Sequence, residues 1–225
     1  MLEHRSYQRV GVPELRVAAG ESATIVGAAA VFRSYSQNLG GFVEQIEGRA
    51  FDDVLDDDVV ALVNHDPNLL LARSGAGSLR LTTDDDALRY EIDLDLSDPD
   101  GVSAAAKVRS GAMPGSSFSF VVADDGDSWS LTEQGFPLRT ISRIGRLYDV
   151  GPVTRPAYKG TEGSGAATAM RSLSVFTGAP IAELVAAAGR NELRSFLPVA
   201  NEQPSTSHVD SNAYRARQLS LVAKR

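Results

Sequence analysis

Apolar and polar residues alternate along much of the first 160 residues, with the period of two that is typical of β-strands. The clearest example is LRYEIDLDL, residues 88–96, in which Leu, Tyr and Ile side chains occupy every second position and charged side chains lie between them. This pattern predicts a strand that buries one face in an antiparallel sheet. SLRLTT, residues 78–83, precedes it across the turn TDDDA, so we predict that the two segments form a hairpin.

Further strands are predicted where short runs of apolar or β-branched residues end at turn residues. These runs are ATIVGAAAVF (23–32), VVALV (59–63), FSFVVA (118–123), DSWSLT (127–132) and PLRTISRI (137–144). The third and fourth runs flank the turn sequence DDGD, which predicts a second hairpin.

Two short helices are predicted between these strands. RAFDDVL, residues 49–55, has apolar residues at helical spacing over about two turns. VSAAAKVRSG, residues 102–111, follows a turn in which Ser97 or Asp98 can cap the helix, and Gly111 can end it. The sequence therefore predicts a mainly β domain with short helices (α+β), most simply an antiparallel β-barrel surrounded by helices, because closure removes exposed sheet edges.

The composition changes after Tyr158, which divides the chain into a domain, residues 1–160, and a flexible, partly helical C-terminal extension, residues 161–225. We predict a linker over residues 159–169 and a helix, broken near Gly189, over residues 179–197. A second linker over residues 198–211 and a short amphipathic helix over residues 212–225 are predicted to follow.

Charge and composition exclude several classes of protein. The net charge is −7, yet residues 159–225 carry eight Lys and Arg against five Asp and Glu, so the domain itself is strongly acidic. Nucleic-acid binding needs clustered basic residues, so we expect no nucleic-acid partner. No apolar run reaches the roughly 18 residues of a membrane helix, so we expect no membrane partner. Cysteine is absent, which excludes disulfides and thiolate chemistry and fits a reducing cytoplasm.

Of the three histidines, His65 is the one we place within the folded domain. His4 is in a polar N-terminal segment and His208 in the linker-like tail. His65 follows the predicted strand VVALV and precedes a turn that contains proline. A lone histidine is more often structural than catalytic, but catalytic groups are common where a strand gives way to a loop.

The run GAMPGSSFSFVV, residues 111–122, places two serines at the start of a strand. Phe118 shares one face of this strand with Ser116, while Ser117 is on the other face. If the phenylalanine is in the core, Ser117 points away from it. A serine hydroxyl becomes a nucleophile when a neutral imidazole takes its proton. Serine is also common in turns, so the composition alone leaves both a turn and a nucleophile open.

An acidic residue would complete such a site, because the base needs an acceptor that fixes its tautomer. Asp149 lies between Tyr148 and Val150 in a stretch with little other negative charge, so its carboxylate needs a partner. The acidic turn DDGD, residues 124–127, lacks the full spacing of a calcium loop. One histidine in the domain and no cysteine leave few metal ligands, so we predict no metal and no cofactor.

Five segments together resemble the prohead (capsid-maturation) serine proteases of tailed bacteriophages, which are distantly similar to the herpesvirus assemblin proteases. They are FVEQIEGRAFDDVL, VVALVNHDP, SLRLTTDDDALRYEIDL, GAMPGSSFSF and RLYDVGPVTRPAYKGT, in this order, and the resemblance covers about residues 23–161. It implies an assemblin-like barrel and an endopeptidase in the host cytoplasm, inside the procapsid. The implied substrates are the scaffolding protein, the major capsid protein and the protease itself, and the relatives imply self-association.

By position in these motifs, the resemblance implies that His65 is the general base, Ser117 the nucleophile and Asp149 the acidic third member. The assemblins use a second histidine as the third member, and we see none to spare in this domain. Ser116 remains a one-residue alternative to Ser117. Donors to the oxyanion are open between backbone N–H groups of residues 111–117 and the side chains of Arg143 and Arg146, which are near Asp149 in the sequence.

Two other functions remain open. One is a catalytically inactive assembly protein that binds scaffold with the same domain, for which Ser117→Ala would change nothing. The other is an unrelated hydrolase or ligand-binding domain whose motifs coincide by chance, which would act without capsid proteins. For the protease, the C-terminal extension is a candidate segment for docking to the scaffold or shell, removed by self-cleavage.

Overall fold

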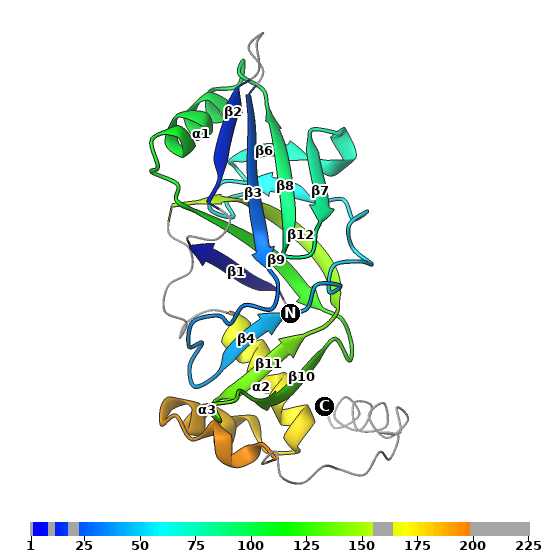
Figure 1. Cartoon of the computed structure of the whole chain (residues 1–225), viewed down its shortest axis with the longest axis vertical. Helices are drawn as coiled ribbons and strands as arrows, with labels where there is room; N and C mark the ends of the chain where they lie inside the picture. The colour runs from blue at the N-terminus through cyan, green and yellow to red at the C-terminus, as the bar shows by residue number, and fades with distance from the viewer. Residues whose placement is uncertain (1, 9–11, 18–22, 155–163, 199–225) are drawn as a thin grey trace.

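The computed structural model describes residues 2–8, 12–17, 23–154 and 164–198, and its strands form three sheets (Figure 1). The largest sheet has the order β1-β9-β12-β5-β6 and consists of β1 (Glu3–Gln8), β9 (Gly115–Val122), β12 (Ile144–Val153), β5 (Val60–Leu62) and β6 (Leu70–Arg73). The four-stranded sheet has the order β2-β3-β8-β7 and consists of β2 (Glu14–Val17), β3 (Ala23–Val31), β8 (Ala87–Leu94) and β7 (Leu79–Thr83). The three-stranded sheet has the order β10-β11-β4 and consists of β10 (Asp127–Leu131), β11 (Pro137–Ile141) and β4 (Val43–Ile46).

The mainly β, α+β class is confirmed, but the sheets are not closed into a barrel among the described strands, and two of the strand pairs, β12 with β5 and β11 with β4, are parallel rather than antiparallel. Alternation of side chains shows which face of a strand is buried and does not show which strand pairs with which, so closure could not be read from the pattern. The likeness to the assemblin arrangement stays a prediction.

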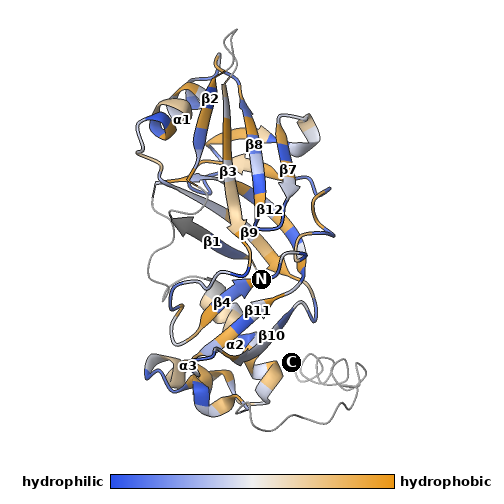
Figure 2. Ribbon diagram, viewed as in Figure 1, coloured by the Kyte–Doolittle hydropathy of each residue, from blue (hydrophilic) through white to orange (hydrophobic). Residues whose placement is uncertain are grey.

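One predicted hairpin is confirmed and the other is wrong. β7 and β8 pair antiparallel, with Leu81 opposite Tyr90, and Figure 2 shows the alternation of apolar and polar residues along β8. β9 and β10 instead belong to different sheets, although only a short turn separates them. The carbonyl of Gly126 in this turn accepts hydrogen bonds from the N–H groups of Ser142 and Arg143. The returning chain thus separates the two strands, so that β9 pairs with β12 and β10 with β11.

The helix predicted at residues 102–111 is confirmed as α1 (Pro99–Arg109). Its N-cap is Asp98, whose carboxylate accepts from the N–H of Asp100 at 3.0 Å, and Gly111 follows its end with φ +73°. The helix predicted at residues 49–55 is wrong. The segment forms successive turns, whose backbone hydrogen bonds run from the N–H of residue i to the carbonyl of residue i−3. Phe51 in this segment is fully buried in the core.

The main hydrophobic core lies between the five-stranded and four-stranded sheets. Phe118 and Phe120 of β9 are fully buried in it, with ring centroids 4.9 Å apart, and Phe51 packs against Phe118 at 5.6 Å. One face of β9 is therefore fixed against the core, which orients Ser117 and Ser119 on the opposite face.

A second core joins the three-stranded sheet to the helices that follow residue 163. These are α2 (Ser164–Thr177), α3 (Ile181–Gly189) and the short 3₁₀ helix η2 (Leu193–Phe196), while a further 3₁₀ turn, η1 (Ser74–Ala76), follows β6. Trp129 of β10 lies in this core, and its indole N–H donates to Ser172 Oγ at 2.9 Å.

The packing of α2 corrects part of the predicted C-terminal organisation. The predicted linker is wrong from Ser164 onward, because α2 begins there and its apolar residues cover the sheet. The predicted helix after Pro180 is confirmed as α3, while the second linker and the terminal helix, including His208, lie outside the described residues. No single described helix is long and apolar enough to cross a membrane, and the one pair that passes by length and composition, Ala166–Thr177 with Ile181–Gly189, is bent by 118°.

Candidate active site

Ser117 lies within the five-stranded sheet, on β9, which is between β1 and β12. Ser6 of β1 is opposite it on one side and Gly151 of β12 on the other. Because Phe118 faces the core, the Ser117 side chain is on the opposite face of the sheet, as the alternation predicts. Ser117 is nevertheless fully buried, so this face of β9 is also covered.

His65 lies in a tight turn directly after β5. His65 and the preceding Asn64 both have positive φ angles, +60° and +55°, which are uncommon for residues other than glycine and are frequent at functional sites. Asn64 anchors the turn to the end of β12, because its Oδ1 accepts from the N–H of Thr154 at 2.8 Å and its own N–H donates to the carbonyl of Pro152 at 3.2 Å. The imidazole is thus held beside β12 by the backbone.

Gly151 permits the close approach of β12 to this turn. A Cβ atom at this position would lie 2.1 Å from the carbonyl oxygen of Leu62, the last residue of β5, and the φ angle of +156° is also unfavourable for a side chain. A side chain here would push the His65 turn away from β12. The sequence contains this glycine beside Asp149, but nothing in the sequence links it to Leu62.

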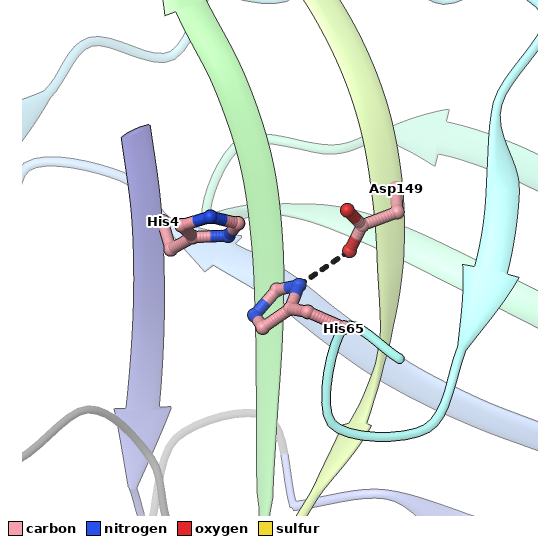
Figure 3. Close-up of side chains that lie close together, drawn as sticks. All are labelled: His4, His65 and Asp149. Atoms are coloured by element: carbon pink, nitrogen blue, oxygen red, sulfur yellow. Dashed lines mark hydrogen bonds and ion pairs between the residues drawn. The ribbon is translucent and has the colours of Figure 1, made fainter. Parts of the chain in front are cut away.

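Asp149 lies on β12, opposite Ser119 of β9 and Val60 of β5. Its Oδ1 is 2.5 Å from His65 Nδ1, and His65 Nε2 is 2.5 Å from Ser117 Oγ. Figure 3 shows the carboxylate directed at the imidazole. The three residues singled out from the sequence, which come from three separate segments, are therefore brought into one hydrogen-bonded series.

Ser116, the alternative nucleophile, points to the other side of the strand. Its Oγ is 2.8 Å from the hydroxyl of Tyr90, deep in the core. Burial raises the pKa of Tyr90, and the bond to Ser116 opposes this only in part. Ser116 thus has a partner in the core, on the face of β9 opposite to that of Ser117.

The prediction that His4 lies outside the folded domain is wrong. His4 is on β1, opposite Ser119, and its ring centroid is 4.5 Å from that of His65 in an edge-on arrangement (Figure 3). Ser119 Oγ lies between the two rings, 2.6 Å from His4 Nδ1 and 3.0 Å from His65 Nδ1. The segment EHRSYQ has no alternating apolar residues, so periodicity gives no signal for this strand.

Burial lowers the pKa of His4 below its ordinary value of 6.5. Charge on His65 lowers this pKa further, Asp149 raises it, and Arg5 lowers it again. At neutral pH the ring is therefore uncharged, and its Nδ1 can accept the hydroxyl proton of Ser119. The polar series Asp149–His65 thus continues through Ser119 to His4.

His4, His65 and Asp149 also form a group of three possible metal ligands, whose donor atoms lie within 4.8 Å of one another. Two ligands of one zinc ion at tetrahedral angles lie about 3.4 Å apart, since each is about 2.1 Å from the metal. The 2.5 Å between Nδ1 and Oδ1 is too short for that arrangement and fits a shared hydrogen bond. We therefore treat the group as a hydrogen-bonded network.

Neither of the two arginines considered as oxyanion donors contacts Ser117. Arg146 is opposite Val121, four residues and about 13 Å along β9 from Ser117, and its guanidinium lies 5.1 Å from the ring centroid of Tyr148. Arg143 donates from Nη2 to the carbonyl of Asp124 at 2.6 Å. The other candidates, backbone N–H groups of residues 111–117, stay a prediction.

Residues 10–174 match the family of caudovirus prohead serine proteases, a span that includes His65, Ser117 and Asp149 and that leaves out His4. No curated protein and no solved structure matches the chain significantly. Because the matched span is more than half of the chain, the protein belongs to the caudovirus prohead serine protease family.

Proposed function

We propose that this protein is a serine endopeptidase that matures the phage procapsid, with Ser117 as nucleophile, His65 as general base and Asp149 as the residue that orients His65. The observation that carries the proposal is the pair of 2.5 Å contacts, from Asp149 to His65 Nδ1 and from His65 Nε2 to Ser117 Oγ. Family membership supports the same role in capsid maturation.

The reaction follows from these contacts. His65 Nε2 takes the proton of Ser117 Oγ as the oxygen attacks a peptide carbonyl, and His65 later gives this proton to the leaving amine. Asp149 accepts the hydrogen bond of Nδ1, so that Nε2 is the free base and the imidazolium is stabilised when it forms. A tetrahedral oxyanion also needs N–H donors, for which backbone groups of residues 111–117 are the candidates.

The proposed substrates are the scaffolding protein, the major capsid protein and the protease itself, cut inside the procapsid in the host cytoplasm. Self-association, and docking of the C-terminal extension to the scaffold before its removal by self-cleavage, belong to the same proposal. The rival function, an inactive scaffold-binding protein, predicts no cleavage in any of these cases.

The proposal is tested by intact mass spectrometry of the purified chain over time, alone and with the capsid and scaffolding proteins of the same phage. We expect fragments with the wild type and none with Ser117→Ala. Ser116→Ala is the matched control, because its hydroxyl bonds Tyr90 in the core, and it is expected to keep the activity. Cleavage that persists in Ser117→Ala and is lost in Ser116→Ala would move the nucleophile, and no cleavage by the wild type would favour the rival function.

A further inference from the structure

β1 is the edge strand of the five-stranded sheet and pairs with β9, beside the proposed nucleophile (Figure 1). The two strands are antiparallel, and Ser117 Oγ donates to the carbonyl oxygen of Arg5 at 2.8 Å. A peptide that binds by adding a strand to a sheet edge makes this kind of contact. The backbone of β1 therefore has the position and direction of a peptide presented to Ser117.

The hydroxyl proton of Ser117 can go to only one acceptor at a time. Oγ lies 2.5 Å from His65 Nε2 and 2.8 Å from the carbonyl oxygen of Arg5. While the hydroxyl of Ser117 donates to the carbonyl of Arg5, it does not give its proton to His65, so the site is at rest with β1 in place.

The side chain of Arg5 is held by a buried acidic group. Its Nε is 2.6 Å from Glu44 Oε1 and its Nη2 is 2.8 Å from Oε2, a bidentate pair, and the guanidinium lies 5.6 Å from the ring centroid of Phe120. Burial alone would raise the pKa of Glu44, but Arg5 and Arg139 outweigh it, so this pKa is lowered and the carboxylate is charged. Glu44 thus recognises a basic side chain.

Two residues before Arg5, Glu3 meets a cation in the same cluster. Arg139 Nη1 donates to Glu3 Oε2 at 2.9 Å and to Glu44 Oε2 at 2.9 Å, and its Nε donates to Asp127 at 2.5 Å. Without β1, the three remaining charges of Glu44, Asp127 and Arg139 leave one net negative charge. The cluster therefore offers a cation for an incoming Glu and an excess of negative charge for an incoming Arg.

His4, between Glu3 and Arg5 in the sequence, is on the other face of β1 and packs edge-on against His65. In addition, β1 lies outside residues 10–174, the span that matches the protease family. Both observations fit a segment that occupies the active site rather than one that builds it.

We propose that β1 occupies the substrate strand of the active site, and that the protease cuts extended peptides of the form Glu-X-Arg after the Arg, here at the Arg5–Ser6 bond. This rests on the proposed function. Ser117 Oγ forms an ester with the carbonyl carbon of Arg5 while the bond to the Ser6 nitrogen breaks, and the proton of Ser117 passes through His65 to that nitrogen. Water then hydrolyses the ester and leaves a carboxylate on Arg5.

The test uses the full chain and a synthetic peptide with the sequence of residues 1–12, MLEHRSYQRVGV. We expect a product that ends at Arg5, formed by the wild type and not by Ser117→Ala. Replacing the peptide's Arg5 by Ala is expected to lower kcat/KM by at least about tenfold, because the bidentate pair with Glu44 is lost. Replacing its Glu3 by Ala is expected to have a smaller effect in the same direction, and replacing its Arg9 by Ala is the control expected to leave the rate unchanged.

A variant of the protein gives a second measurement. Arg5→Ala loosens β1 and is expected to raise the rate of peptide cleavage several-fold, while Arg80→Ala, which removes an exposed ion-paired arginine of β7, is the matched control. If Arg5→Ala does not fold, the series of peptides by itself tests the inference.

Digestion of the phage's own capsid and scaffolding proteins is run in parallel. Ser117-dependent digestion of these proteins, with the peptide left uncut or cut equally well without its arginine, overturns the inference and leaves the proposed function intact. No digestion of protein or peptide overturns the proposed function, and the inference with it.

Discussion

Asp149 accepts from His65 Nδ1 at 2.5 Å and is itself largely buried, so the loss of this contact is poorly compensated by solvent. In Asp149→Asn an amide would replace the carboxylate, and the other tautomer of His65 would be favoured, with its proton on the nitrogen that faces Ser117. We expect kcat to fall by about 10⁴ with little change in KM, as measured by steady-state cleavage of the capsid protein. Asp58→Asn, which removes an exposed carboxylate paired with Arg73, is the control, and a kcat within a few-fold of the wild type in Asp149→Asn would contradict the orienting role.

Gly151 is the second residue whose replacement should act on catalysis. In Gly151→Ala the new Cβ would meet the Leu62 carbonyl at 2.1 Å and displace the turn that carries His65. A shift of about 1 Å at a reacting group typically costs about 10² in rate, so we expect a loss in kcat of this order. Gly77→Ala is the matched control, because its φ of +75° imposes strain while its Cβ would meet nothing within 4 Å. If Gly77→Ala lost as much activity as Gly151→Ala, backbone strain alone would explain the loss.

At the scale of the element, β1 should respond to pH through His4. Because burial lowers the pKa of His4 below 6.5, the unfolded chain binds a proton more readily than the native one. The free energy of unfolding should therefore fall as the pH drops below 6.5 toward the lowered pKa, since protonation favours the unfolded chain and the undocked strand. The neighbouring charges are those of His65, Asp149 and Arg5.

The measurement is urea unfolding of the wild type and of His4→Gln at about pH 7.5 and about pH 5.5, on either side of the ordinary histidine pKa. We expect the wild type to lose more stability than His4→Gln between the two conditions. His208→Gln is the control for a histidine in the linker-like tail of the sequence. Equal losses in the wild type and His4→Gln would mean that His4 takes up its proton without cost to the native state.

Strand pairing explains which elements could be predicted from the sequence. The strands whose apolar residues alternate were found, as β8 shows, and so was α1 with its Asp98 cap, because these signals are local. The pairing of β9 with β12, and above all with β1, which lies more than 100 residues away in the sequence, depends on non-local contacts that alternation does not encode. The predicted helix at residues 49–55 failed because burial of Phe51 overrides a short local propensity.

At the scale of the whole molecule, the same limit applied to the site. Ser117, His65 and Asp149 could be singled out because a motif order and the face of one strand identified them. His4 and the buried ion pairs could not, because each partner looks like an ordinary polar residue in its own segment. Glu44 in the sequence FVEQIE gives no sign that it meets Arg5, 39 residues away, and Arg139.

These ion pairs also connect the two parts of the molecule. Glu3 and Arg5 are on the five-stranded sheet, while Glu44, Asp127 and Arg139 are on the three-stranded sheet that carries α2 and α3. Glu44, like Glu3, contacts both arginines. Its loss would leave two buried cations short of a partner, so the cluster should act as a single link between the sheets.

In Glu44→Gln we expect the free energy of unfolding to fall by about 3–5 kcal/mol, the typical result of removing one partner of a buried ion pair. Because the pKa of Glu44 is lowered in the native state, its contribution is present above its ordinary pKa of 4.5 and is lost as the pH falls through the lowered value. Urea unfolding at neutral and at acidic pH measures both effects, since the difference between the wild type and Glu44→Gln should shrink in acid. Glu91→Gln, which alters a partly exposed pair with Arg80, should cost less than about 1 kcal/mol. A cost for Glu44→Gln as small as this would mean that burial of the carboxylate already cancels the attraction of its partners, and that the link between the sheets rests on apolar contacts instead.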